Sequence, residues 1–177
     1  MKVLLHTCCG PCASACIPRL REEGHEVTLF YSNSNINTVE EFEKRLDAVR
    51  HLAQADSVEL VVDSYDHGDW LEQVAQGFEN EPEKGARCAR CFRYNLARTA
   101  DYAAAHGFDA FATSLSVSPH KISAMIFASF DDKRFLKADF KKKDGFKASL
   151  KRSEELGLYR QSYCGCEFSF CCVSRIK

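Results

Sequence analysis

The fold is decided at the start of the chain, by Lys2-Val3-Leu4-Leu5-His6-Thr7-Cys8-Cys9-Gly10-Pro11-Cys12. Residues 2–6 form a short apolar run that is typical of a buried strand. Pro11 stands at a favoured first-turn position of a helix, which Gly24 should end. Cys16 falls on the apolar face of that helix, so we expect it to pack in the core. The stretch therefore predicts a strand joined to a helix by a turn rich in cysteine.

The same alternation of strand and helix continues along the chain. Four repeats of it predict an α/β fold, a doubly wound parallel sheet with right-handed crossovers. Thr38 and Glu41 have the spacing of a capping box at the start of the second helix, whose apolar stripe should run from Val39 to Ala53. The strands are expected at 2–6, 26–31, 58–62 and 108–113. Further helices are expected around 70–75, after Cys88, at 122–130 and at 146–156.

The unusual residues of the chain follow the predicted strands. Parallel sheets bind their ligands beyond the carboxyl ends of the strands, at one edge. The loops at 8–12, 33–37 and 114–121 each follow a strand, and the turn at 88–91 lies on a crossover. The first loop has neither of the glycine-rich patterns that hold phosphate. We therefore expect a metal centre at the edge where such folds usually hold a nucleotide.

Seven of the ten cysteines fall into three tight clusters. A Cys-x-x-Cys turn brings two sulfurs onto one metal ion, and this chain has more soft ligands than one tetrahedral ion uses. The pattern favours an iron–sulfur cluster with a further metal beside it, or a cluster with spare thiols. Structural zinc and free or redox-active thiols are the alternatives. The seven are Cys8, Cys9, Cys12, Cys88, Cys91, Cys164 and Cys166.

The composition is that of an ordinary globular protein. A chain of 177 residues, 45% hydrophobic, is most simply one domain. No apolar run approaches the roughly 20 residues that a membrane helix needs. The first residues lead directly into a polar His6-Thr7, without a signal segment, so we expect a cytoplasmic protein whose cysteines form no disulfides.

Positive charge is concentrated in the segment 133–152. It contains nine Lys or Arg against two Asp, a local net charge of +7, so the rest of the chain carries −8. Phe135, Phe140 and Phe146 are interleaved with these charges. Basic and aromatic residues together suit a surface that holds phosphate and stacks bases, although such a block is also common on a solvated face.

A second candidate site is the Ser-Pro-His-Lys sequence at 118–121. His120 and Lys121 could donate protons or bind phosphate. Alternatively, Ser118 or His120 only caps the helix that follows. His6 ends a buried strand beside the cysteines, where a structural role and a hydrogen bond to a metal ligand are both open.

Five motifs in this order resemble the QueH family, the cobalamin-independent epoxyqueuosine reductases. The resemblance covers about 2–169, nearly the whole chain, and leaves a variable tail at 170–177 that contains Cys171 and Cys172. The motifs are His6-Thr7-Cys8-Cys9-Gly10-Pro11-Cys12, Cys88-x-x-Cys91-Phe92, Ser118-Pro119-His120-Lys121, Asp139-Phe140-Lys141-Lys142-Lys143-Asp144-Gly145 and Tyr159-Arg160-Gln161-x-Tyr163-Cys164-Gly165-Cys166-Glu167-Phe168-Ser169.

The resemblance implies the last step of queuosine synthesis, in which epoxyqueuosine at the wobble position of tRNA is reduced to queuosine. It implies a fold similar to the adenine-nucleotide alpha-hydrolase (HUP-like) proteins and a single domain over 1–169. It also implies a [4Fe–4S] cluster and an additional mononuclear iron, held by the seven motif cysteines. Some members place a carboxylate on the lone iron, and Cys12 would stand in its place.

The partners implied are tRNA carrying epoxyqueuosine and an external one-electron donor, because the chain has no flavin or NAD motif. His120 or Tyr163 is the expected proton donor. Two other functions would account for parts of the pattern: a cluster-dependent tRNA sulfur transferase, and a zinc-bound module that binds RNA. The residues expected to contact nucleic acid are Lys121, Lys141, Lys142, Lys143 and Arg160.

Overall fold

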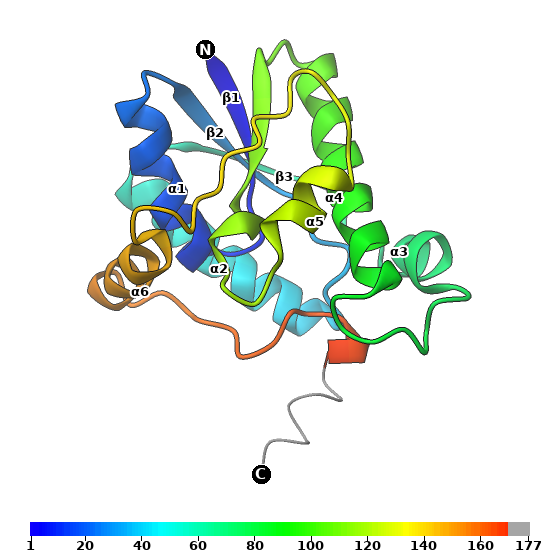
Figure 1. Ribbon diagram of the computed structural model, residues 1–177. Helices are drawn as coiled ribbons and strands as arrows, with labels where there is room; N and C mark the ends of the chain where they lie inside the picture. The colour runs from blue at the N-terminus through cyan, green and yellow to red at the C-terminus, as the bar shows by residue number, and fades with distance from the viewer. Residues whose placement is uncertain (170–177) are drawn as a thin grey trace.

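The computed structural model describes residues 1–169, which form a parallel sheet covered by helices (Figure 1). The strands stand in the order β3-β2-β1-β4, and every neighbouring pair is parallel. The α/β sheet predicted from the alternation is therefore confirmed. The strands are β1 (Lys2–His6), β2 (Glu26–Tyr31), β3 (Glu59–Val62) and β4 (Ala110–Thr113).

The helices follow the strands as expected. The α-helices are α1 (Gly10–Glu22), α2 (Val39–Ala55), α3 (His67–Trp70), α4 (Ala86–Ala105), α5 (Ser123–Ala128) and α6 (Gly145–Glu155). No helix within residues 1–169 has both the length and the apolar character that crossing a bilayer requires. A π-helical turn, η1 (Leu71–Ala75), extends α3, and a 3-10 turn, η2 (Ser114–Val117), follows β4.

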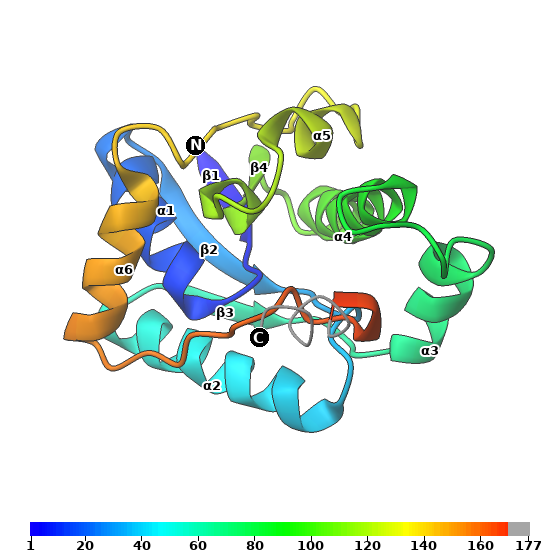
Figure 2. The same ribbon diagram turned by 60° about the horizontal axis from the view of Figure 1, so that its bottom comes forward.

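The central strand β1 is buried on both faces, as strands of parallel sheets are. Val3 and Leu5 pack with α1 and α2, whereas Leu4 packs with α4 and α5. Figure 2 shows α1, α2 and α6 on one side of the sheet and α4 on the other. The chain thus changes sides between β3 and β4. The neighbouring strands β1 and β4 make the switch point, beyond which a ligand site is expected.

Helix α2 starts almost as predicted. The Thr38 hydroxyl accepts a hydrogen bond from the backbone N–H of Glu41 (3.2 Å), which is one half of the expected capping box. The Glu41 carboxylate binds Arg45 instead of turning back to Thr38. The expected apolar stripe is wrong at Val39, which is 56% exposed because the first turn of α2 precedes the part of the helix that packs on the sheet.

Candidate metal centre

All seven cysteines of the three clusters line one cavity of about 590 Å³. Three elements and one extended segment surround it: the start of α1, the start of α4, the turn at 118–121 and residues 159–169. We call residues 159–169 the C-terminal strap. The prediction that these cysteines share one edge of the sheet is confirmed. The eight cysteines within the described residues are all free thiols, and Cys16 is buried in the core as expected.

Cys8, Cys9 and Cys12, here called the N-terminal thiol group, lie where β1 passes into α1. Their sulfur atoms lie within 4.8 Å of one another, close enough to bind a single metal ion together. Cys9 precedes the first residue of α1 in extended conformation, and Cys12 follows in the first turn. A helix N-terminus favours negative charge, which suits thiolate ligands.

The thiols of the N-terminal thiol group differ in their pKa. Hydrogen bonds from Cys12 and Cys8 hold the pKa of Cys9 well below its ordinary value. Hydrogen bonds with Cys8 and Cys9, followed by burial, raise the pKa of Cys12 well above its ordinary value. One thiolate is thus stabilised by neighbouring thiols that keep their protons. A bound cation would compensate the charge of all three and release those protons.

The other four cysteines, here called the composite thiol group, come from two distant segments. Cys88 and Cys91 stand at the start of α4, and Cys164 and Cys166 stand on the C-terminal strap. Burial raises the pKa of Cys91 well above its ordinary value, and the charges of Cys164 and Cys166 raise it further. Burial, followed by the charge of Cys164, raises the pKa of Cys166 to about 11. Burial and the charge of Cys164 thus oppose the ionisation of both Cys91 and Cys166, and a positive centre among these half-buried thiols would favour their thiolate forms.

Cys8 lies between the two groups. Besides its place in the N-terminal thiol group, it lines a second, smaller recess together with Cys91 and Cys164. Its sulfur also accepts a hydrogen bond from the Ser114 hydroxyl (3.3 Å). The two thiol groups are therefore continuous through Cys8, and they make one site.

The surroundings of Cys91 fit a bound metal. The indole of Trp70 packs against Cys91, and its buried N–H has no well-formed hydrogen bond within residues 1–169. The amide nitrogen of Asn95 lies 3.9 Å from the Cys91 sulfur. A metal-bound thiolate accepts such N–H groups readily, and hydrogen bonds of this kind tune iron–sulfur centres. Both the donor set and its polar neighbours thus suit an iron–sulfur cluster.

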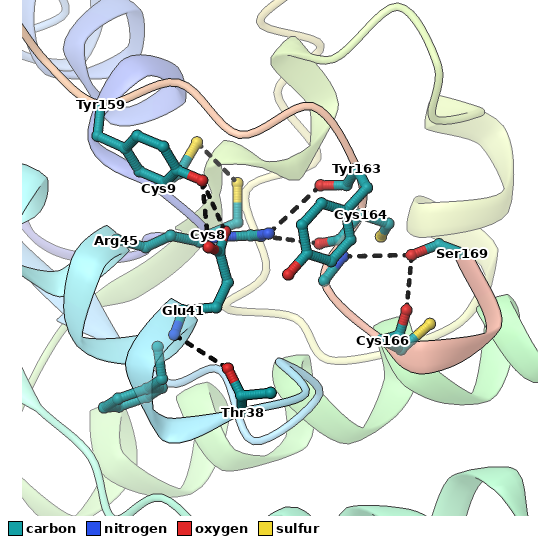
Figure 3. Close-up of polar contacts among 12 residues, drawn as sticks. Cys8, Cys9, Thr38, Glu41, Arg45, Tyr159, Tyr163, Cys164, Cys166 and Ser169 are labelled. Carbon is teal, nitrogen blue, oxygen red and sulfur yellow. Dashed lines mark hydrogen bonds and ion pairs between the residues drawn. The ribbon is translucent and has the colours of Figure 1, made fainter. Parts of the chain in front are cut away.

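The C-terminal strap is tied to helix α2 by Arg45 (Figure 3). The guanidinium donates to the carbonyl oxygens of Cys164 and Tyr163 and to the carboxylate of Glu41. Sequence reasoning missed Arg45 because it belongs to no cysteine motif. One signal could have found it: Arg45 stands three residues after Phe42 and four before Val49, so a charge interrupts the buried stripe of α2.

The turn at 118–121 faces both thiol groups. His120 is exposed and lines the cavity, while Lys121 is half-buried. Burial alone would lower the pKa of Lys121, but the thiolate charges of Cys164 and Cys8 outweigh it and raise the pKa. The alternative that Ser118 or His120 caps a helix is wrong. Ile122 precedes α5, and the Ser118 hydroxyl accepts from the His120 N–H (3.3 Å), which closes the turn before the helix begins.

The five residues expected to contact RNA differ in their surroundings. The Lys141 ammonium donates to the carbonyl oxygens of Lys121 (2.6 Å) and Ser118 (3.3 Å), so it is bound to the turn at 118–121. Lys142 and Lys143 are exposed just before α6. Arg160 is exposed at the cavity, with its guanidinium 6.0 Å from the ring centre of Phe146.

His6 has a structural place below the site. Its Nδ1 lies 2.9 Å from the Thr113 hydroxyl of β4, and its Nε2 lies 3.1 Å from the Ser32 carbonyl after β2. Burial lowers the pKa of His6 from its ordinary value. A neutral, fully buried imidazole thus joins the carboxyl ends of β1, β2 and β4. These contacts hold in place the end of β1, from which the cysteine turn follows.

Comparison with known proteins places this chain in a family. The family model described as "Epoxyqueuosine reductase QueH" matches residues 3–171. A relative of that name from Streptococcus pyogenes serotype M1 is 35% identical over 94% of this chain and 69% of its own length. Relatives of the same name from Dehalococcoides mccartyi and Thermotoga maritima are 35% and 34% identical, covering 95% and 94% of this chain and 92% and 89% of their own. The family match takes in Cys171, which lies outside the described residues, as does Cys172.

Proposed function

The chain belongs to the QueH family, whose members are epoxyqueuosine reductases, and we propose that it reduces epoxyqueuosine to queuosine at the wobble position of tRNA. The reaction breaks the two C–O bonds of the epoxide and leaves a C=C double bond. It consumes two electrons and two protons, and the oxygen departs as water. Membership of the family makes the chain an oxidoreductase. The electrons come from an external one-electron donor.

The observation that carries this proposal is the single cavity lined by all seven cysteines together with His120 and Tyr163. A reductive elimination needs an electron source, a proton source and room for the base at one place. The thiols supply soft ligands for a metal centre in the cavity, and the two titratable side chains line the same cavity. A base must leave its stack to enter such a cavity.

The two thiol groups suggest how the metals are divided. The N-terminal thiol group would hold the mononuclear iron, because three converging sulfurs leave a coordination position open. The composite thiol group would hold the [4Fe–4S] cluster with its four sulfurs. When bound, such a centre supplies single-electron transfer and a Lewis-acidic iron. Cys8 belongs to the N-terminal thiol group and also lines a recess with Cys91 and Cys164, so it would lie between the two metals.

The protein's own side chains bind the substrate and hold the protons. Burial and the charge of Glu41 raise the pKa of Tyr163, so its hydroxyl keeps its proton at neutral pH. His120, exposed at the cavity, would exchange protons with solvent. We assign phosphate contacts of the anticodon arm to Lys142, Lys143 and Arg160, which are all exposed. Lys121 faces the thiols, where its positive charge would stabilise the departing oxygen.

Two coarser features belong to the same proposal. We take residues 1–169, including the basic segment 133–152, as one metalloenzyme domain, because the strap closes onto the cavity from the far end of the chain. The residues 170–177 would then be a variable tail. A tRNA substrate implies that the protein works in the cytoplasm.

Metal analysis of protein purified without oxygen tests this function. We expect about five irons per chain together with acid-labile sulfide, as a cluster plus one iron requires. With a chemical one-electron reductant, the protein should convert an anticodon stem-loop carrying epoxyqueuosine into the queuosine form. Stoichiometric zinc without sulfide would support the RNA-binding zinc module instead. ATP-dependent sulfur incorporation into tRNA would support a sulfur transferase.

A further inference from the structure

Arg45 is a buried charge with two partners on the C-terminal strap and one on its own helix. Its side chain is 2% exposed, in the middle of helix α2. Nη1 donates to the Cys164 carbonyl (2.9 Å), and Nη2 donates to the Tyr163 carbonyl (3.4 Å). Nε donates to the Glu41 carboxylate (2.7 Å). Every nitrogen of the guanidinium therefore has an acceptor, and two of the three acceptors are consecutive carbonyls of the strap (Figure 3).

The pair with Glu41 alone does not explain why this charge is buried. Withdrawing an ion pair from water costs several kcal/mol per ion, and the mutual attraction of the pair offsets this only with further hydrogen bonds. The strap carbonyls provide those bonds. A planar guanidinium with donors in a fixed fork sets the orientation of two successive peptide groups, which a lysine cannot do.

Two neighbours extend the contact. The Tyr159 hydroxyl lies 3.1 and 3.2 Å from the two carboxylate oxygens of Glu41, so the carboxylate holds the start of the strap as well as Arg45. The ring centre of Tyr163 lies 5.0 Å from the guanidinium carbon. Helix α2 thus contacts the strap at Tyr159 and again at Tyr163 and Cys164.

Gly165 shows how closely the strap lies against α2. Its φ of +134° is a conformation that side chains rarely adopt. A Cβ built there would stand 3.1 Å from Arg45 Nη1 and 3.2 Å from the Ile36 side chain. The Cys-x-Cys pair therefore has glycine between its thiols because the backbone passes directly over Arg45.

We propose that Arg45 is a positioning residue that fixes the Cys164-Gly165-Cys166 loop opposite the two cysteines of α4. The interpretation of that loop as a cluster ligand rests on the proposed function, but the positioning itself does not. Cys88 and Cys91 are already placed by α4, whereas the strap has no helix or strand at its two cysteines. Arg45 adds two hydrogen bonds from a charged group to the strap, next to the Asn37 N–H that donates to the Gly165 carbonyl (2.8 Å).

Hydrogen exchange of the full-length protein as purified tests the positioning. In Arg45→Met, the amides of the strap should exchange at least about tenfold faster, because the strap loses two hydrogen bonds to a charged group. Amides of the 8–12 turn should keep their wild-type rates. Arg50→Met is the matched control, because Arg50 lies on the same helix with its side chain 53% exposed and pairs with Asp47. It should leave both regions unchanged.

Rescue and metal content separate positioning from general support of the fold. Arg45→Lys should restore part of the strap protection, since an ammonium replaces one of the two carbonyl contacts. Arg45→Met should also lose sulfide and iron faster under a chelator than Arg50→Met. Where Arg45→Met folds poorly, Glu41→Gln keeps the guanidinium and should loosen the strap to a smaller degree.

Two results would overturn the proposal. Wild-type exchange of the strap in Arg45→Met would show that the loop is held by other contacts. Equal acceleration in the strap and the 8–12 turn would show that Arg45 only supports the fold. A protein without sulfide whose strap still loosens in Arg45→Met would defeat the proposed cofactor and leave the positioning role intact.

Discussion

The two thiol groups differ in how the chain builds them. The N-terminal thiol group lies within residues 8–12, where the end of β1 and the first turn of α1 place its sulfurs within 4.8 Å of one another. The composite thiol group joins α4 to a strap without regular structure at its cysteines, and a side chain from α2 holds that strap. One group is therefore built by local sequence, and the other by tertiary contacts far apart in the chain.

The largest expected effects come from removing one ligand of each group. Cys91→Ser should abolish acid-labile sulfide and most of the iron, because a cluster with three thiolates and a weak fourth ligand is readily lost. Cys12→Ser should remove about one iron per chain and keep the sulfide, since its proposed metal is a single ion. Iron and sulfide assays on the two anaerobically purified variants measure the difference.

A Cys8 variant tests to which of the two metals this shared thiol belongs. Cys8→Ser should resemble Cys12→Ser if Cys8 serves the mononuclear iron, and Cys91→Ser if it serves the cluster. Identical losses in all three variants would mean that the metals assemble as one unit, and the division into two sites would be wrong.

Both groups depend on helix α2, and Gly10 tests that dependence for the N-terminal thiol group. A Cβ at Gly10 would stand 2.9 Å from the backbone oxygen of Ala48, so α1 approaches α2 as closely as a glycine permits. Gly10→Ala should lower the free energy of unfolding by about 1–3 kcal/mol, the usual cost of overpacking. Chemical denaturation measures this. Unchanged stability with intact metal would show that the 8–12 turn can shift freely against α2.

Much of this architecture could be predicted from local sequence. The strands alternate with helices because apolar runs such as 2–6 are bounded by turn residues, and parallel sheets gather the loops that follow their strands. Cys16 could be assigned to the core from helical spacing alone. These inferences succeed because each depends on neighbours within a few residues.

The interactions that hold the site together could not be predicted in the same way. Arg45 meets Cys164 across most of the chain, and Trp70 meets Cys91 from a separate helix. Lys141 looked like one member of a basic run, but its ammonium is bound to the carbonyls of the 118–121 turn. A run of three lysines gives no sign of which one turns inward, because that depends on the fold of a segment twenty residues away.

The three lysines provide the next prediction. Lys141→Ala should reduce kcat about tenfold, the effect of losing a well-bonded ammonium, because the turn that faces both thiol groups loses its support. Lys142→Ala and Lys143→Ala should leave kcat unchanged and weaken tRNA binding. Each should reduce the slope of log affinity against log salt by roughly one unit. Turnover and binding of the epoxyqueuosine stem-loop across a salt series separate the two effects.

Iron content should be the same in all three lysine variants. If all three variants reduced the slope of log affinity against log salt equally, Lys141 would have to be assigned to the RNA-binding surface. Equal, wild-type slopes in Lys142→Ala and Lys143→Ala would show that this part of the basic segment is only a solvated face.

The smallest effect is expected one helical turn beyond the N-terminal thiol group. Cys16 is fully buried, and its thiol donates to the carbonyl oxygen of Cys12 (3.3 Å). Cys16→Ser keeps a donor at that place and exchanges a sulfur for a smaller, more polar oxygen, so stability should fall by only about 1 kcal/mol. Iron and sulfide should stay at wild-type levels, because the side chain points into the core and away from the cavity. Cys172→Ser, outside the described residues, should change neither stability nor metal content, and Cys171→Ser should behave likewise. Loss of iron in any of these three variants would mean that a thiol beyond the seven binds metal, and the contrast between a local and a composite group would have to be redrawn around it.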